Sequence, residues 1–278
     1  MNWLGTNSLG RFGNKIFAYF FLICCQRRLG VKCSTATWEG NDFFNLTLGN
    51  NREGGDRYVS INFETITDRS EGPDPLIDIV DKLIGVLKCR IEIQGAFQFH
   101  TRTFASLKEL FIASFPFRDD KVESLQSKLP ARLSNFENLV VVHYRAGDYL
   151  GIKGNPLLWS YDFRDLLLFV KQISTVAPDA FFYICSDSND YIAKFRNEFP
   201  TQSISSYDFQ LDIDDDARLF TDYYLQTNAK ILIASNSSLS ISSALLNQRA
   251  RLFFRPSSRS GMFVNFDPWD TQVLLSSP

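Results

Sequence analysis

The stretch Leu139-Val-Val-Val-His-Tyr144, followed by Arg145-Ala-Gly-Asp148, decides the fold of this 278-residue chain. Apolar residues fill the first part almost without interruption, whereas a strand with one face in water would alternate apolar and polar residues. A continuous apolar run of this length is typical of a strand in a parallel sheet covered by helices on both faces. The stretch therefore predicts an α/β fold, with residues 145–148 at the carboxyl end of a buried strand.

Strands and helices alternate regularly from this strand onward. Further apolar runs predict strands at 180–185, 230–234 and 251–255. The patterns between and around them predict helices at 161–174, 189–199, Asp215–Asn228 and Ser238–Leu246. Such an alternation is typical of a parallel sheet. We expect Leu139–Tyr144, 180–185 and 230–234 to be parallel members of one sheet.

The first half of the chain is also α/β, and the pattern indicates a separate domain. A short strand at 2–4 leads into a glycine loop at 6–14 and a helix at about 15–29, which Gly30 ends. A helix at 76–87, a strand at 90–94 and a helix at 107–115 follow. The stretch 116–138 is polar and is interrupted by Pro130. We expect a boundary there, between an N-terminal domain at 1–125 and a C-terminal domain at 126–278.

The composition argues against several classes of protein. A net charge of −2 offers no basic excess for nucleic acid or an anionic membrane. Five cysteines without a C-x-x-C spacing, and only two histidines, argue against a disulfide framework or a metal site. The apolar run 16–25 is too short to cross a bilayer and lacks the charged flank of a signal peptide, so we expect a cytoplasmic protein without a transmembrane segment. The 26 phenylalanines indicate large aromatic cores.

Two common nucleotide-binding motifs are missing from the sequence. The segment Gly10-Arg-Phe-Gly13 joins a strand to a helix, but it lacks the full G-x-G-x-x-G spacing of a dinucleotide-binding loop. No G-x-x-x-x-G-K-[ST] phosphate loop occurs anywhere. The sequence therefore gives little support to an NAD enzyme or a P-loop kinase.

Polar residues follow three of the expected strands, at the edge where open α/β sheets bind ligands. They are Arg145 to Asp148, Asp187, and Ser235-Asn-Ser-Ser238. A guanidinium such as that of Arg145 can hold a phosphate by two parallel hydrogen bonds, although it could instead pair with Asp148. The serine segment opens a helix and is suited to bind an anion, although it could simply cap that helix. Asp187 could accept hydrogen bonds from a ribose or a guanine, or cap the helix near Asn189.

Six segments, in the right order and over nearly the whole chain, resemble the motifs of α-1,2-fucosyltransferases. Gly10-Arg-Phe-Gly-Asn-Lys-Ile-Phe17 resembles G-x-x-G-N-Q-x-F, and His143-Tyr-Arg-Ala-Gly-Asp-Tyr149 resembles H-x-R-R-G-D-Y. The other segments that match are Gly95-Ala-Phe-Gln98, Phe182-Tyr-Ile-Cys-Ser-Asp187, Asp222-Tyr-Tyr-Leu225 and Ile231-Leu-Ile-Ala-Ser-Asn-Ser-Ser-Leu-Ser240, which Ala244-Leu-Leu-Asn247 follows. The wider superfamily includes α-1,6- and protein O-fucosyltransferases.

This resemblance implies a GT-B fold, with two Rossmann-like domains facing across a cleft. It implies an inverting glycosyltransferase, without a metal or other cofactor, that moves L-fucose from GDP-fucose to a glycan hydroxyl. The nucleotide-sugar donor would bind mainly to the C-terminal domain, and the glycan acceptor would approach from the N-terminal side. By position, Arg145 would hold the donor diphosphate, His143 would lie near the nucleotide and Asp187 near the base or ribose. The further donor-binding residues that it implies are Gly10, Arg11, Gly13, Asn14, Asn236, Ser237 and Ser238.

Two questions stay open on the sequence alone. Asp148 is the nearest candidate for the base that takes the acceptor proton, but it could equally orient Arg145. Ala146 stands where the family has a second arginine, and Lys15 where it has glutamine. The donor could therefore be another nucleotide sugar, such as GDP-mannose, GDP-rhamnose or a UDP-pentose. A non-catalytic protein that binds sugar nucleotides or glycans is the alternative from a different class.

Overall fold

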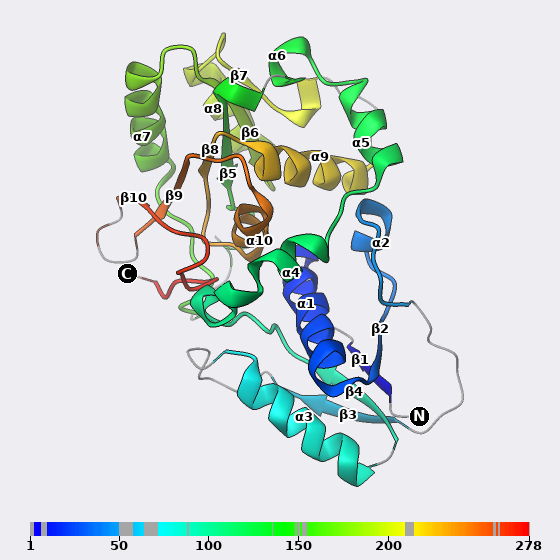
Figure 1. Ribbon diagram of the computed structural model, residues 1–278. Helices are drawn as coiled ribbons and strands as arrows, with labels where there is room; N and C mark the ends of the chain where they lie inside the picture. Colours follow the sequence, from blue (N-terminus) through cyan, green and yellow to red (C-terminus); the bar gives the residue numbers. More distant parts are fainter. Residues whose placement is uncertain are drawn as a thin grey trace. The chain divides into compact units, whose positions relative to one another are not determined.

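The chain forms two compact units, each built on its own sheet (Figure 1). The computed structural model describes residues 3–6, 10–49, 58–63, 72–87, 89–134, 136–147, 149, 151, 155–208, 214–257, 260 and 262–277. Unit 1 comprises Met1–Asp119 and Trp269–Val273, and unit 2 comprises Asp120–Pro268 and Leu274–Pro278. The chain therefore passes from unit 1 to unit 2, returns to unit 1 for five residues, and ends in unit 2.

Unit 1 contains a four-stranded parallel sheet. Its strands are β1 (Trp3–Thr6), β2 (Lys32–Thr35), β3 (Tyr58–Asn62) and β4 (Arg90–Gln94), in the order β2-β1-β4-β3. Its helices are α1 (Phe12–Leu29), α2 (Gly40–Phe43), α3 (Asp74–Leu87) and α4 (Lys108–Ala113), with a 3₁₀ helix at Thr101–Leu107. Gly30 ends α1 as predicted: its φ of 65° is left-handed, and its N–H bonds to the carbonyl of Gln26.

An aromatic core surrounds α1 in unit 1. The helix is buried on most of its circumference between Phe12 and Cys25, in keeping with its nearly continuous apolar sequence. The ring of Phe111, on α4, is wholly buried and lies 4.8 Å from that of Phe20 and 5.7 Å from that of Trp269, between ring centroids. Trp269 belongs to the returning segment, which therefore contributes to the core of unit 1.

Unit 2 contains a six-stranded sheet in the order β10-β9-β8-β5-β6-β7. Its strands are β5 (Leu139–Tyr144), β6 (Phe181–Ser186), β7 (Ser203–Ile204), β8 (Ile231–Ile233), β9 (Leu252–Pro256) and β10 (Phe263–Asn265). All neighbours are parallel except β9 and β10. Val140 is in register with Phe182 of β6 and with Ile231 of β8. The three strands expected to be parallel members of one sheet are so.

Helices cover both faces of the unit 2 sheet. They are α5 (Asp119–Gln126), α6 (Ala131–Ser134), α7 (Phe163–Val176), α8 (Asn189–Glu198), α9 (Asp215–Asn228) and α10 (Ser238–Leu246). Val140, Val142 and Tyr144 share one face of β5 and pack in one cluster with residues of α7 and α8. His143 lies on the opposite face and contacts Ser240 of α10. All six residues of β5 are consequently buried, which explains its uninterrupted apolar sequence.

Candidate functional site

The carboxyl ends of three neighbouring strands bring most of the expected site residues of unit 2 to one edge of its sheet. Arg145 follows β5, Asp187 follows β6, and the segment Ser235–Ser238 follows β8. The strand order places β8 and β6 on either side of β5. Parallel strands end at the same edge, so these loops are neighbours even though about 90 residues separate them in the chain.

The carboxylate of Asp187 organises the loop that follows β5. Its Oδ1 accepts hydrogen bonds from the backbone N–H groups of Ala146 and Gly147, both at 2.9 Å. Its Oδ2 lies 3.1 Å from Nε of Arg145. Partial burial opposes ionisation, but the N–H groups of Gly147 and Ala146 and the charge of Arg145 outweigh it, so the pKa of Asp187 lies below its ordinary value. Asp187 is thus an ionised anchor that fixes the orientation of Arg145.

Two small residues make this arrangement possible. A Cβ on residue 147 would lie 2.8 Å from Oδ2 of Asp187, so only glycine lets the carboxylate approach. Ala146 is wholly buried and packs in the cluster that contains Tyr144 and Tyr161. An arginine at position 146, which the resembling family has, would not fit here without repacking of that cluster. The smaller side chain therefore agrees with the local packing of this chain.

Arg145 is the cation at this edge that the sequence analysis singled out. Only 13% of its side chain is exposed, and its Cζ lies 5.2 Å from the centroid of the Tyr149 ring. The expected alternative partner, Asp148, lies outside the described residues. The helix that follows Asp187 has Ser188 at its N-cap, so Asp187 serves the Arg145 loop rather than that helix.

His143 is a neutral link between β5 and α10. It is 4% exposed, and its Nδ1 lies 2.5 Å from Oγ of Ser240 and 3.0 Å from Oγ of Ser235. Burial, assisted by the charge of Arg145, lowers the pKa of His143 to about 3. The ring is therefore uncharged at neutral pH, and it holds the strand against the first turn of the helix.

The hydrogen-bonding capacity of the Asn236 side chain is fully used by other groups of the protein. Its Nδ2 donates to the carbonyls of Leu157 and Leu275, at 2.9 and 3.0 Å, and its Oδ1 accepts from Leu275 N at 2.8 Å and from Nη2 of Arg255 at 3.2 Å. Two donors and two acceptor sites are the full capacity of a carboxamide. Asn236 therefore ties the loop at 157 and the C-terminal segment to this edge of the sheet.

The serines of the same segment open α10. The hydroxyl of Ser237 accepts a hydrogen bond from Leu239 N at 3.2 Å, which makes it the N-cap. Ser238, the first residue of the helix, is partly exposed. The N-terminus of α10 carries the partial positive charge of the helix dipole and no acidic residue in its first turn. This end of the helix is suited to an anion.

Arg255 is a residue of this edge that the sequence analysis did not select. It lies near the end of β9, is 2% exposed, and its Cζ lies 5.3 Å from the Phe266 ring centroid. Burial lowers the pKa of Arg255 to about 10. An arginine near the carboxyl end of an apolar strand was the signal in the sequence that could have identified it.

Unit 1 brings together three residues of the remaining motifs. Gly10 has a φ of 101°, and a Cβ there would lie 2.1 Å from Nδ2 of Asn14. Gln98 donates from Nε2 to Oδ1 of Asn14 at 2.5 Å. Arg11 is exposed and is the N-cap residue of α1, whereas Gly13 is buried within the helix. Lys15 donates to both carboxylate oxygens of Glu39, at 3.1 and 2.8 Å.

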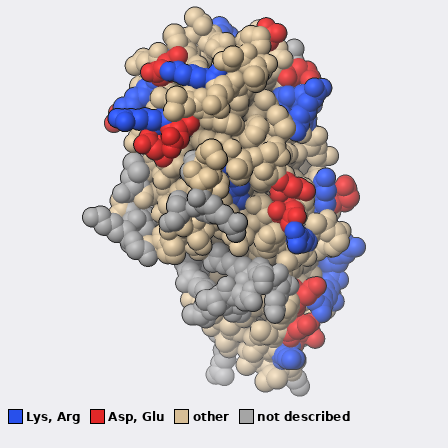
Figure 2. All heavy atoms as spheres, turned by 90° about the vertical axis from the view of Figure 1, so that its left-hand side faces the viewer, with Lys and Arg blue, Asp and Glu red and all other residues tan. Residues whose placement is uncertain are grey.

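Charged side chains of both signs lie on the surface of the protein. Figure 2 shows basic and acidic side chains interspersed on one face of the molecule, without a single large basic field. Within the described ranges, no three His, Cys, Asp or Glu side chains gather as a metal site would require. Asp214 caps α9, because its side chain accepts a hydrogen bond from Ala217 N at 2.8 Å. None of the described helices is both long and apolar enough to span a membrane.

The comparisons with known proteins identify the fold. No family model matches the chain, and no curated protein matches its sequence. Among solved structures, fucosyltransferase NodZ from Bradyrhizobium has a TM-score of 0.63 at 11% identity, over 100% of both chains. POFUT1 in complex with GDP-fucose has a TM-score of 0.59 at 11% identity, over 91% of this chain and 97% of that one. The R284K mutant of Arabidopsis thaliana FUT1 in complex with GDP has a TM-score of 0.60 at 9% identity, over 91% and 70%. The expected fold class, an α/β fold of the GT-B type, is therefore confirmed.

Replacement of Gly147 by alanine should disrupt the Asp187 anchor. The new Cβ would displace the carboxylate and weaken its two backbone hydrogen bonds, at a cost of about 1.5 kcal/mol for bonds to a charged group. A thermal melt followed by circular dichroism measures this loss. Gly85→Ala is the matched control: it lies inside α3 with nothing within 4 Å of its new Cβ, and should stabilise the protein slightly. Equal melting of Gly147→Ala and wild type would contradict the anchor.

His143 should make stability fall in mild acid. The unfolded chain takes up the imidazole proton near pH 6.5, whereas the folded chain resists it down to about pH 3. The neutral ring therefore contributes stability that is present above pH 6.5 and is lost progressively as the pH falls towards 3. The variant His143→Asn keeps a polar group near the two serines but does not titrate. Its melting temperature should fall less than that of wild type between pH 7 and 4.5, and identical pH slopes would refute the assignment.

Proposed function

We propose that this protein is a glycosyltransferase that moves L-fucose from GDP-fucose to a hydroxyl of a glycan acceptor, with inversion at the anomeric carbon. The observation that carries the proposal is the Arg145 guanidinium, which Asp187 holds at the carboxyl edge of the unit 2 sheet. The fold of the whole chain is similar to that of fucosyltransferase structures. The motif resemblance supports the α-1,2 linkage within this class. The GDP-fucose in the POFUT1 complex supports the donor.

In this proposal the donor diphosphate lies between Arg145 and the N-terminus of α10. The bond between the anomeric carbon and the phosphate oxygen breaks, GDP leaves, and the acceptor oxygen forms the new bond on the opposite face of the sugar. Negative charge grows on the leaving diphosphate, so a preorganised guanidinium stabilises the transition state more than the ground state. Ser237 and Ser238 assist at the helix end, and no metal ion is required.

The other expected residues take indirect or acceptor-side roles. Asp187 acts on the donor through Arg145, because both its oxygens are engaged with the β5 loop. His143 holds the first turn of α10 through Ser240, and Asn236 ties the segment before this helix to Leu157 and Leu275. The motif resemblance gives donor-binding roles to four residues of unit 1, which are Gly10, Arg11, Gly13 and Asn14. Asp148 remains our candidate for the base that takes the proton of the acceptor hydroxyl.

Substitution of Arg145 tests the catalytic assignment. Arg145→Ala should lower kcat by about 100- to 1,000-fold, as loss of a comparable preorganised donor does elsewhere. Arg145→Lys keeps the charge but loses the planar fork, so its activity should lie between that of alanine and wild type. Initial rates against GDP-fucose concentration measure both effects. Arg164→Ala, which removes an exposed arginine of α7, is the control for charge. A folded Arg145→Ala protein with near-normal kcat would place the donor elsewhere.

The donor itself is tested by binding and turnover in the wild-type protein. A nucleotide sugar present at 100 times its Kd should stabilise the folded state by about 2.7 kcal/mol, which a thermal melt detects. We expect GDP and GDP-fucose to do so, and only GDP-fucose to give transfer in the presence of a glycan. Turnover with GDP-mannose, GDP-rhamnose or a UDP-pentose instead would change the donor but keep the reaction class. Stabilisation by GDP-fucose without transfer or hydrolysis would favour a binding protein.

A further inference from the structure

The side chain of Asn14 is held at both ends of its carboxamide. Gln98 donates from Nε2 to Oδ1 of Asn14, and Gln98 is itself only 4% exposed. The other end, Nδ2, lies against Gly10, where an added Cβ would come within 2.1 Å of it. A carboxamide presents a donor at one end and an acceptor at the other. The donor of Gln98 therefore selects which end of Asn14 faces the glycine loop.

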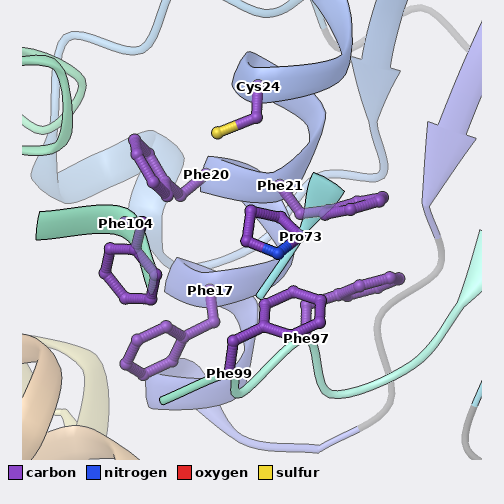
Figure 3. A pocket seen from close by; sticks show the side chains of 8 residues that line it. All are labelled: Phe17, Phe20, Phe21, Cys24, Pro73, Phe97, Phe99 and Phe104. Carbon is purple, nitrogen blue, oxygen red and sulfur yellow. The ribbon is translucent and has the colours of Figure 1, made fainter. Parts of the chain in front are cut away.

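The backbone before Gln98 is in a conformation that needs support. Phe97 has a φ of 48°, which is rare for a bulky residue and costs free energy. Its ring stacks on that of Phe21 of α1, with the centroids 4.5 Å apart and the planes at 11°. Figure 3 shows the two rings lying parallel in the wall of a small apolar pocket, beside Phe99 and Pro73. The stacked ring thus holds a turn that directs Gln98 towards Asn14.

We propose that Gln98 is a positioning residue for the reaction: it fixes the carboxamide of Asn14 so that Nδ2 faces the Gly10 loop. The inference rests on the proposed function, which gives Asn14 a role in binding the donor. In this proposal Gln98 does not touch the donor and acts only through Asn14. The segments 10–14 and 95–98 are then coupled through this hydrogen bond, although about 80 residues separate them in the chain.

The positioning role predicts different results for two substitutions of Gln98. Gln98→Met keeps the volume in a buried position but cannot donate, so the Asn14 amide is released. Gln98→Glu offers an acceptor instead of a donor, so the Asn14 amide turns over and presents Oδ1 to the loop. We expect kcat/KM for GDP-fucose to fall about tenfold in the first, the effect of losing one hydrogen bond, and further in the second. Gln94→Met, at the end of β4, is the matched control and should leave the rate unchanged.

A double-mutant cycle separates positioning from a structural role. In an Asn14→Ala background Gln98 has nothing to position, so Gln98→Met should then have no further effect on kcat/KM. Equal tenfold losses in both backgrounds would overturn the proposal, as would an equal loss in Gln94→Met. Thermal melts of all variants check folding, and a variant that melts below the assay temperature is replaced by Gln98→Glu in the same cycle.

Nuclear magnetic resonance tests the same contact without activity. The side-chain NH₂ pair of Asn14 is assigned by its disappearance in Asn14→Ala. We expect Gln98→Met and Gln98→Glu to shift this pair, and Gln94→Met to leave it in place. An unmoved pair in both Gln98 variants would refute the positioning role. A shifted pair in a protein that transfers no fucose would retain the positioning role but refute the proposed function.

Discussion

The contact between the Asp187 carboxylate and the loop after β5 is the interaction on which the edge of the unit 2 sheet depends. It joins two neighbouring strands at their carboxyl ends, and it does so with an ionised group that accepts from two backbone N–H groups and pairs with one guanidinium. A carboxylate held in this way cannot move without exposing several polar groups at once. Arg145 is therefore oriented before any ligand arrives, which is the condition under which electrostatic stabilisation of a leaving group is most effective.

Other polar side chains at this edge also form hydrogen bonds with protein groups. His143 joins β5 to α10 through two serines, and Asn236 joins β8 to the loop at 157, to β9 and to the C-terminal segment. Buried polar networks of this kind are stable only when each member has its partners. These hydrogen bonds therefore form a rigid frame around the N-terminus of α10.

The sequence was sufficient for the four central parallel strands of unit 2, but not for its outer strands β7 and β10 or for the roles of the residues at its edge. Continuous apolar runs identified the parallel strands, since burial on both faces leaves no alternation of polar and apolar residues. In unit 1, a glycine at position 30 identified the end of α1, because glycine readily adopts the left-handed backbone found there. That Asp187 serves Arg145 depends on β5 and β6 being neighbours, and strand order is a property of the packed sheet rather than of any local pattern. The burial of Arg255 and the saturation of Asn236 likewise depend on residues far away in the chain. The return of Trp269–Val273 to unit 1 had no signal in composition or periodicity.

That return has a consequence for the order in which the protein can assemble during its synthesis. Thr101 and Thr271 exchange backbone and side-chain hydrogen bonds of 2.9 to 3.0 Å, Arg102 grips Asp270 with two, and Trp269 packs on Phe111. A nascent chain that has just completed residue 119 therefore lacks part of the first unit's core, and residues 120–268 must be translated before it receives that part. The first unit therefore stays incomplete while residues 120–268 are added, and in a ribosome-bound intermediate Phe111 lacks its contact with Trp269 throughout that interval.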